Sequence, residues 1–150
     1  MICAGGTNFP DKPMLEGGTK TWTDRIFTLS PGENGWTEAG TLPAPYAYGA
    51  SASTREGLLC IGGCGKEGHR KDVYLLSTAD GAVTVTPFPP LPIALAYTAA
   101  AVLDDKVYLT GGCERPGEQD CTNRVFMLDA REPEQGWQEL DPLPGRGRFL

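Results

Sequence analysis

The fold is decided by residues 2–29, ICAGGTNFPDKPMLEGGTKTWTDRIFTL, in which an apolar strand ends in a glycine pair before a long loop and a second strand. The same plan returns twice with shorter loops, because glycine pairs also close the apolar runs LLCI at 58–61 and VYLT at 107–110. The second glycines of the pairs, Gly6, Gly63 and Gly112, lie 57 and 49 residues apart. The sequence therefore predicts an internal repeat of roughly fifty residues.

Self-similarity at this period, with four short strands in each unit, is typical of a propeller blade of the kelch type. We therefore expect an all-β fold, a kelch-type β-propeller, with about three four-stranded blades of a six-bladed ring. The blades are expected at 2–43, which lacks its inner strand, at 48–92 and at 97–144, with the start of a fourth at 146–150. Trp36 and Trp137 follow equivalent turns and are expected to pack between blades.

Two small-residue segments, 48–54 and 97–103, are expected to be innermost strands, where the propeller axis is crowded. By propensity alone, residues 94–103 are also compatible with a short helix. The match between the two segments favours the strand. Because three units cannot close a ring, we read the chain as about half of a longer protein, with an obligate dimer of half-rings as the less favoured alternative.

Composition favours turn-rich β structure over disorder, since twenty glycines and thirteen prolines accompany ordinary apolar content. The net charge of −6 and the lack of a basic cluster argue against nucleic-acid binding. No apolar run is long enough to cross a membrane, and no signal peptide is visible. The compartment, cytoplasmic or periplasmic, stays open.

The cysteines give little support for a metal site or a disulfide framework. Cys3 and Cys60 lie in apolar strand patterns and are expected to be buried as small hydrophobes. Cys113 and Cys121 flank one loop and can pair in an oxidising compartment, but an odd, unevenly spaced set of five is more typical of reduced thiols. With no CxxC motif and a single histidine, His69, no metal is expected.

The long first loop, residues 7–23, carries the most distinctive motifs. GGTNFP at 5–10, EGGTKTW at 16–22 and DRIFTL at 24–29 resemble the kelch-repeat N-acetylneuraminate epimerases, in particular the cyclically permuted sialic acid mutarotases. The resemblance implies a bacterial enzyme that interconverts the α and β anomers of sialic acid by acid–base ring opening, without a cofactor or metal. It also implies a small-molecule sugar as ligand and a need for the remainder of the propeller, so that this fragment is expected to be inactive alone.

Groups that support sugar binding are expected on the loops at the propeller mouth: Asn8, Glu16, Lys20 and Arg70. Each has a structural alternative, since Asn8 can cap a turn and Glu16 can pair with Lys20 at the surface. His69 is expected to be solvated. Tyr46 and Tyr48 can stack on a sugar, although packing is the safer interpretation for Tyr48.

No catalytic residue is assigned from the sequence. In the family the proposed catalytic glutamate lies on a Gly-Glu segment with an arginine a few residues on. Residues 114–117, ERPG, are similar in part, but Glu118 and Gln119 follow instead of an arginine. We therefore do not transfer the role to Glu114 and expect the acid and base beyond residue 150. A non-catalytic kelch propeller that binds a protein or carbohydrate is the main alternative, and a copper oxidase on this fold is disfavoured by the single histidine.

Overall fold

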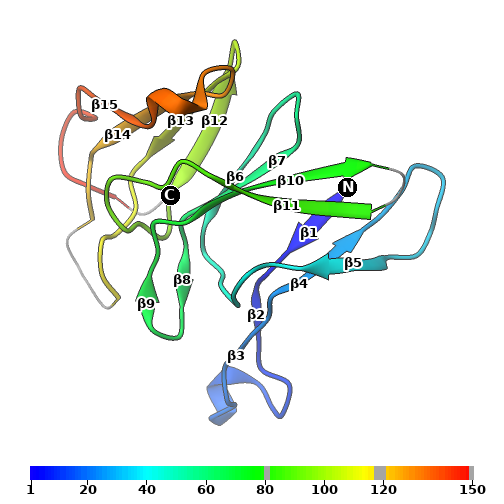
Figure 1. The fold of residues 1–150 in the computed structure, drawn as a ribbon. Coiled ribbons are helices and arrows are strands. Elements are labelled where there is room, and N and C mark those ends of the chain that lie inside the picture. The colour runs from blue at the N-terminus through cyan, green and yellow to red at the C-terminus, as the bar shows by residue number, and fades with distance from the viewer. Residues whose placement is uncertain (80–81, 117–120, 149–150) are drawn as a thin grey trace.

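The structure, a computed structural model, describes residues 1–79, 82–116 and 121–148. Three antiparallel sheets follow one another along the chain (Figure 1). The first has the order β1 (Ile2–Ala4), β4 (Arg25–Thr28) and β5 (Thr37–Thr41). The second has the order β6 (Ala50–Ser53), β7 (Leu58–Ile61), β10 (Val73–Ala79) and β11 (Ala82–Phe88). The third has the order β12 (Ala99–Leu103), β13 (Lys106–Thr110), β14 (Val125–Asp129) and β15 (Gln138–Leu140).

Two small hairpins extend from the glycine pairs on the same side of the sheets (Figure 1). The first pairs β2 (Thr7–Asn8) with β3 (Thr21–Trp22) and carries the 3-10 turn η1 (Met14–Glu16). The second pairs β8 (Cys64–Gly65) with β9 (Gly68–His69). A second 3-10 turn, η2 (Pro133–Gln135), precedes β15. None of the helical segments described is long and apolar enough to span a bilayer.

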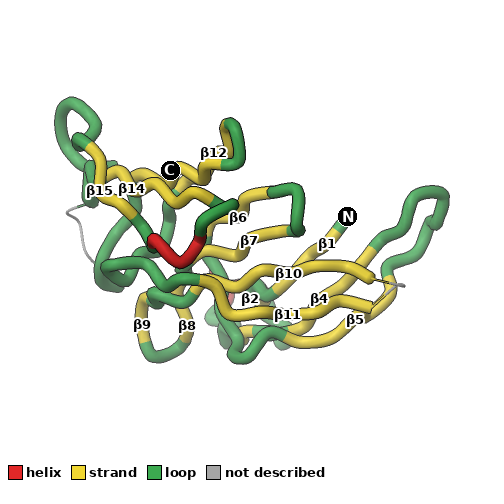
Figure 2. The backbone as a smooth tube through the Cα atoms, turned by 45° about the horizontal axis from the view of Figure 1, so that its top comes forward, coloured by secondary structure: helices red, strands yellow, loops and turns green. Residues whose placement is uncertain are grey.

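The predicted fold class is confirmed: successive meanders of antiparallel strands form propeller blades, and the second and third sheets each have four strands. Neighbouring sheets pack side by side, with β6 beside β12 and β5 beside β11 (Figure 2). Residues 94–103 do not form a helix, because Ala99–Leu103 is strand β12. The expected fourth-blade start at 146–150 lies partly outside the described residues, which end at 148.

The inner strands begin two residues later than the sequence suggests. Tyr48 and Tyr97 were expected to open them, but their φ angles are +61° and +60°, in the left-handed region. A tyrosine in that region cannot continue a strand. The strands therefore start at Ala50 and Ala99.

The largest cluster of buried side chains lies between the second and third sheets. Alternate residues of β13, Val107 and Leu109, face inward and are fully buried, as the pleat of a strand requires. Phe126 joins them from β14. Leu91 and Leu95 complete the cluster from the linker between β11 and β12, residues 89–98. Each such side chain contributes about 1.5–3 kcal/mol by leaving water. The linker is thereby held rigidly beside the hairpins.

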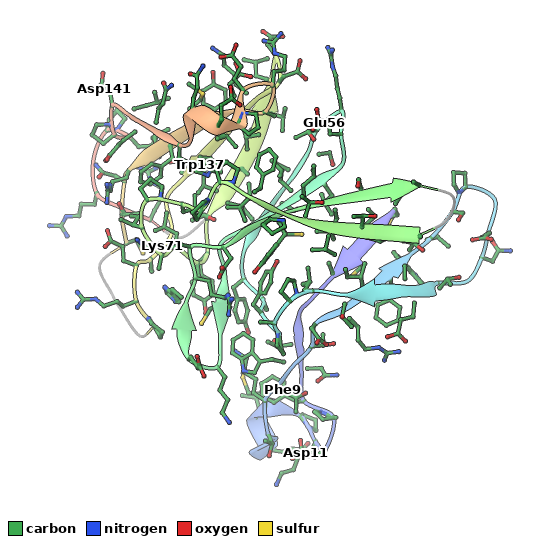
Figure 3. All side chains as sticks on the ribbon, viewed as in Figure 1. Phe9, Asp11, Glu56, Lys71, Trp137 and Asp141 are labelled. Atoms are coloured by element: carbon green, nitrogen blue, oxygen red, sulfur yellow. The ribbon has the colours of Figure 1, made fainter. Side chains whose placement is uncertain are left out.

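The two tryptophans differ in their packing. Trp137 is half-buried against the core cluster, and its Nε1–H donates to the carbonyl of Pro89, 2.9 Å away at the end of the preceding sheet (Figure 3). Trp36 does not fulfil the expectation of packing between blades, because its side chain is 49% exposed. It lies directly before β5, the last strand of the first sheet.

Each glycine pair joins its blade to the next linker. The second glycines donate N–H groups to linker carbonyls at 2.7–2.9 Å: Gly6 to Tyr46, Gly63 to Leu95 and Gly112 to Arg148. The first glycines have φ of +60° to +70°, which non-glycine residues rarely adopt. These joints place the hairpins and the linkers together at one end of the sheets.

Candidate functional site

The loops at the glycine end of the blades converge through contacts between successive units. Isolated β-bridges pair Ala47 with Cys64 and Ala96 with Cys113. The ring Nδ1 of His69 donates to the carbonyl of Cys113 across 2.9 Å. Linkers and post-glycine loops therefore form one continuous mouth.

The first hairpin is ordered by its own polar contacts. The Asp11 carboxylate accepts the backbone N–H groups of Lys12 and Thr19, at 3.0 and 2.9 Å. The hydrogen bond from Thr19 is the main reason that the pKa of Asp11 lies below its usual value. Gly18 packs so closely on the carbonyl of Lys12 that a Cβ there would lie 1.9 Å from it. The hairpin, which carries Phe9 and Asp11 away from the sheets in Figure 3, is thus a defined platform.

Four aromatic side chains cross the mouth in what we call the aromatic row: Trp22, Tyr48, Tyr97 and His69. The ring centroids of Tyr48 and Tyr97 are 4.9 Å apart. Trp22 meets Tyr48 edge-on at 5.9 Å, and His69 meets Tyr97 edge-on at 6.0 Å. Trp22 and Tyr97 were not predicted as site residues. The spacing of 49 residues between Tyr48 and Tyr97 nevertheless equals that between Gly63 and Gly112 and indicates equivalent positions.

Lys20 is held against this row. Its ammonium lies 4.4 Å from the ring centroid of Trp22 and 4.5 Å from that of Tyr48. Such cation–π contacts are attractive and fix the position of the charge. Lys20 also lowers the pKa of Tyr48, through a hydrogen bond to its phenol, and a second hydrogen bond from Thr7 acts in the same direction.

A cavity of about 840 Å³ lies between the two hairpins, and we call it the cationic groove. Lys20 and Trp22 form one wall, and the second hairpin with the residues after it forms the other. The lining includes four cationic side chains, Lys20, Lys66, Arg70 and Lys71, against two acidic ones, Glu67 and Asp72. In a chain with a net charge of −6, this is a local excess of positive charge.

The groove brings together two of the four residues expected to support a sugar, Lys20 and Arg70. Arg70 is partly neutralised, because its Nε donates to Asp72 at 2.8 Å. Asn8 and Glu16 lie outside the groove. Asn8 is exposed and accepts a hydrogen bond from Thr21 within the first hairpin. Glu16 is exposed in η1, and in the described part of the chain it forms no ion pair with Lys20.

Two other expectations about the mouth are corrected. His69 is half-buried rather than solvated, because its ring packs on Tyr97 and donates to Cys113; its Nε2 is buried without a hydrogen-bond partner. Tyr46 is 6% exposed and belongs to the core beneath the linker, so it is not available to stack on a sugar. Burial raises the pKa of its phenol far above the usual value.

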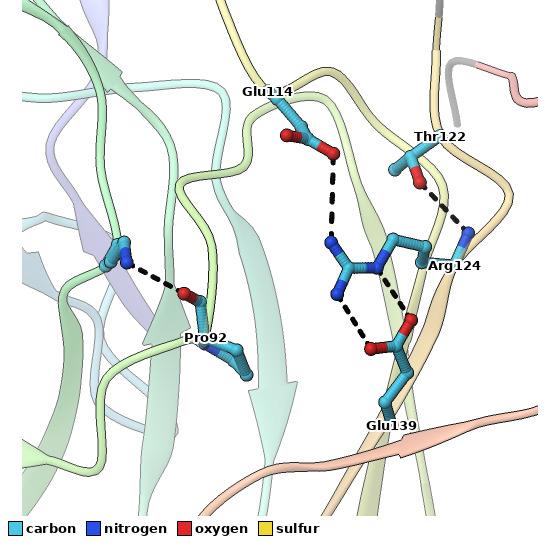
Figure 4. A network of polar contacts seen from close by, with 6 residues as sticks. Pro92, Glu114, Thr122, Arg124 and Glu139 are labelled. Atoms are coloured by element: carbon cyan, nitrogen blue, oxygen red, sulfur yellow. Dashed lines mark hydrogen bonds and ion pairs between the residues drawn. The ribbon is translucent and has the colours of Figure 1, made fainter.

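Glu114 takes part in an ion-pair network at the edge of the third blade (Figure 4). Its carboxylate lies 3.9 Å from the guanidinium of Arg124, which binds Glu139 through two hydrogen bonds of 2.7 Å. This arrangement gives Glu114 a structural partner. Gly117, Glu118 and Gln119, the rest of that motif, lie outside the described residues.

The cysteines are free thiols in this structure. Cys60 is buried, and burial raises its pKa to about 11. Cys3 is exposed instead of buried, because β1 lies at the edge of the described first sheet. Cys113 and Cys121 lie with their sulfur atoms 3.3 Å apart and are not bonded. Within the described ranges, no three His, Cys, Asp or Glu side chains are grouped to hold a metal ion.

Comparison with known proteins finds similarity to kelch-repeat proteins. The Kelch motif matches residues 94–135. A solved structure of YjhT superposes on 85% of this chain and 41% of its own with a TM-score of 0.71, at 17% sequence identity, which supports the fold alone.

Three curated relatives are named N-acetylneuraminate epimerase. Those of Brucella suis and Brucella melitensis are 33% identical over 95 residues, and that of Vibrio cholerae is 34% identical over 96. Each match covers 57% of this chain and 24% of the relative, so the matched part of the chain spans about a quarter of the length of these proteins. The chain is therefore similar, over part of its length, to kelch-repeat proteins that include curated N-acetylneuraminate epimerases.

Proposed function

We propose that this chain forms part of the sugar site of an N-acetylneuraminate epimerase, which converts one anomer of a sialic acid to the other. The observation that carries the proposal is the cationic groove beside the aromatic row, in a chain whose relatives bear that name. A sialic acid presents a carboxylate and a hydroxylated ring. A groove with excess positive charge attracts the first, and aromatic faces suit the apolar side of the second.

Lys20 is the residue best placed to hold the carboxylate. Its ammonium is fixed over two rings and lines the groove, so little side-chain freedom is lost when an anion binds. Arg70 provides a second cation on the opposite wall, with part of its hydrogen-bonding capacity used by Asp72. The anomeric hydroxyl must lose a proton and the ring oxygen must gain one for the ring to open.

The test is NMR of freshly released α-sialic acid, with this chain alone and with a protein in which it is joined to the blades that close the ring. We expect faster mutarotation with the closed ring and none with the 150 residues alone. An unchanged rate with the closed ring would show that the proposed activity is wrong. Acceleration by the chain alone would show that the acid and base lie within these residues.

Variants of Lys20 test the role of the groove. Lys20→Met removes a charge-assisted contact of about 1.5–3 kcal/mol, so we expect KM to rise roughly tenfold to hundredfold. Lys12→Met is the matched control, because Lys12 is an exposed lysine of the same hairpin and does not line the groove. Equal KM values for the two variants would exclude Lys20 as the carboxylate partner.

The alternative, a propeller that binds a protein partner, has one observation in its favour. Met14 and Leu15 at the hairpin tip are 61% and 94% exposed. Exposed apolar side chains on an ordered tip are suited to protein contact. If the closed ring leaves mutarotation unchanged, a binding assay that compares the wild type with Leu15→Ser is the next experiment.

A further inference from the structure

Cys113 and Cys121 begin and end the loop that follows the third glycine pair, which we call the third loop. Their sulfur atoms lie 3.3 Å apart, and the cationic groove is formed without them. Both thiols are reduced in this structure. Cys113 is 1% exposed, whereas Cys121 is partly exposed. One thiol is therefore open to a reagent from solution, and the other is buried directly against it.

A hydrogen bond at the base of each post-glycine loop repeats along the chain. The carbonyl of the second glycine accepts an N–H group from the far side of its loop at 2.8–3.1 Å: Gly6 from Thr23, Gly63 from Arg70 and Gly112 from Thr122. In an antiparallel arrangement, the residues just inside such a hydrogen bond stand opposite each other as a non-hydrogen-bonded pair. The three loops therefore begin with the same cross-strand geometry.

The third loop carries its cysteines at this opposed position. The opposed residues are Thr7 with Trp22 in the first hairpin, Cys64 with His69 in the second, and Cys113 with Cys121 in the third loop. Non-hydrogen-bonded pairs have Cα atoms about 4.5 Å apart, and a disulfide spans Cα separations of about 4.4–6.8 Å. The repeat thus places the two thiols where a disulfide fits.

The backbone on both sides of the pair is held in place. Cys113 exchanges two hydrogen bonds with Ala96 of the linker, at 2.9 and 3.1 Å, and its carbonyl also accepts the ring N–H of His69 at 2.9 Å. Gly147 packs so closely on Cys121 that an added Cβ would lie 1.6 Å from the Cys121 carbonyl oxygen. The sulfur atoms are close because both backbones are fixed, so little movement is needed for them to bond.

We propose that Cys113 and Cys121 form a disulfide across the third loop when a small-molecule disulfide, such as oxidised glutathione, is present. The thiolate of Cys121 attacks that reagent, forms a mixed disulfide and releases one thiol. The thiolate of Cys113 then attacks the sulfur of Cys121 and releases the second thiol. Two protein thiols are oxidised and one reagent disulfide is reduced. The two protons lost by the cysteines are taken up by the two released thiols.

The bond braces the mouth of the blades. Cys113 is already attached to the linker through Ala96 and to the second hairpin through His69. Oxidation adds Cys121, and with it the far side of the third loop, to this connection. A covalent link also removes conformations of the unfolded chain, so the oxidised protein is expected to be more stable than the reduced one.

Treatment of the reduced 150-residue chain with oxidised glutathione tests the pairing. We expect peptide mapping by mass spectrometry to find Cys113 joined to Cys121. Cys64→Ser is the matched control and should still form the bond, because Cys64 follows the glycine pair of the second unit as Cys113 follows that of the third. Two thiols that stay reduced, a bond from either one to another cysteine, or a mixed disulfide that persists on Cys121 would each overturn the proposal.

Urea titration tests whether the bond braces the native fold. The midpoint of the oxidised wild type is expected to lie roughly 1 M above that of the reduced wild type. Cys121→Ser has no partner for Cys113, so its midpoint should be the same with and without the oxidant. A midpoint that oxidation of the wild type leaves unchanged or lowers would show that the bond strains the fold, and the brace would be refuted.

Discussion

The glycine pair offers a sharp test of how the blades are joined. Gly62 has φ +60°, and a Cβ built on it would lie 2.5 Å from the carbonyl oxygen of Leu95. That carbonyl accepts the N–H of Gly63 at 2.7 Å. Gly62→Ala therefore imposes backbone strain and also pushes the linker away from the joint. Gly32→Ala is the matched control, because Gly32 has φ +83° with nothing within 4 Å of the added carbon.

The expected magnitudes follow from these contacts. Both variants carry left-handed strain of about 1–2 kcal/mol, offset in part by roughly 0.4–1 kcal/mol from a less flexible unfolded chain. Gly62→Ala adds about 1 kcal/mol for the weakened hydrogen bond and about 1 kcal/mol or more for the displaced linker. We expect Gly62→Ala to lower the free energy of unfolding by about 2 kcal/mol more than Gly32→Ala, which shifts the urea midpoint by roughly 1 M further. A difference below about 0.5 kcal/mol would show that the joint does not hold the linker.

Two further predictions concern the edges of the blades. Trp137→Phe loses the hydrogen bond to Pro89 and is expected to lower the free energy of unfolding by about 1 kcal/mol in a urea titration. Trp36→Phe, at a half-exposed side chain, should have little effect in the same titration. Equal losses for the two variants would contradict the inter-blade role of Trp137. The hydrogen bonds from Arg124 lower the pKa of Glu139 below its ordinary value of 4.5, so the ion pair stabilises the fold above that pH and is lost as the pH falls below it. Urea midpoints measured on both sides of pH 4.5 should therefore fall less for Glu139→Gln than for the wild type, and parallel losses would show that the pair contributes nothing.

The joints of the blades could be predicted from the sequence because their cause is local. Glycine adopts the φ angles found at the first position of each pair at little cost, and the short apolar runs before the pairs are typical of strands. The start of the inner strands could not be predicted, since Tyr48 and Tyr97 take a conformation that tyrosine avoids when free. That conformation is maintained by tertiary contacts such as the hydrogen bond between the two residues.

The location of the candidate site could be predicted from the sequence, but only some of the residues that form it could. The convergence of the loops follows from the repeat, and it places Lys20 and Arg70 in one groove. The packing of His69 depends on a carbonyl 44 residues away, which no local pattern reveals. Asn8 and Glu16 stay predictions, because the groove is formed without them and their role depends on where the sugar lies.

The chemistry of the mouth comes from departures from the repeat rather than from the repeat itself. The repeat places a tyrosine with a left-handed backbone two residues before each inner strand and packs an aromatic ring against it. Identical repeats would therefore produce equivalent phenols. At equivalent positions the first hairpin has Lys20 and the second has Glu67. Lys20 lowers the pKa of the Tyr48 phenol and adds positive charge to the groove. The proposed substrate, a sialic acid with a carboxylate at one end, suits an asymmetric site of this kind. Charge reversal at Lys20 alone should therefore abolish the difference between the pKa values of Tyr48 and Tyr97 while leaving the blades folded.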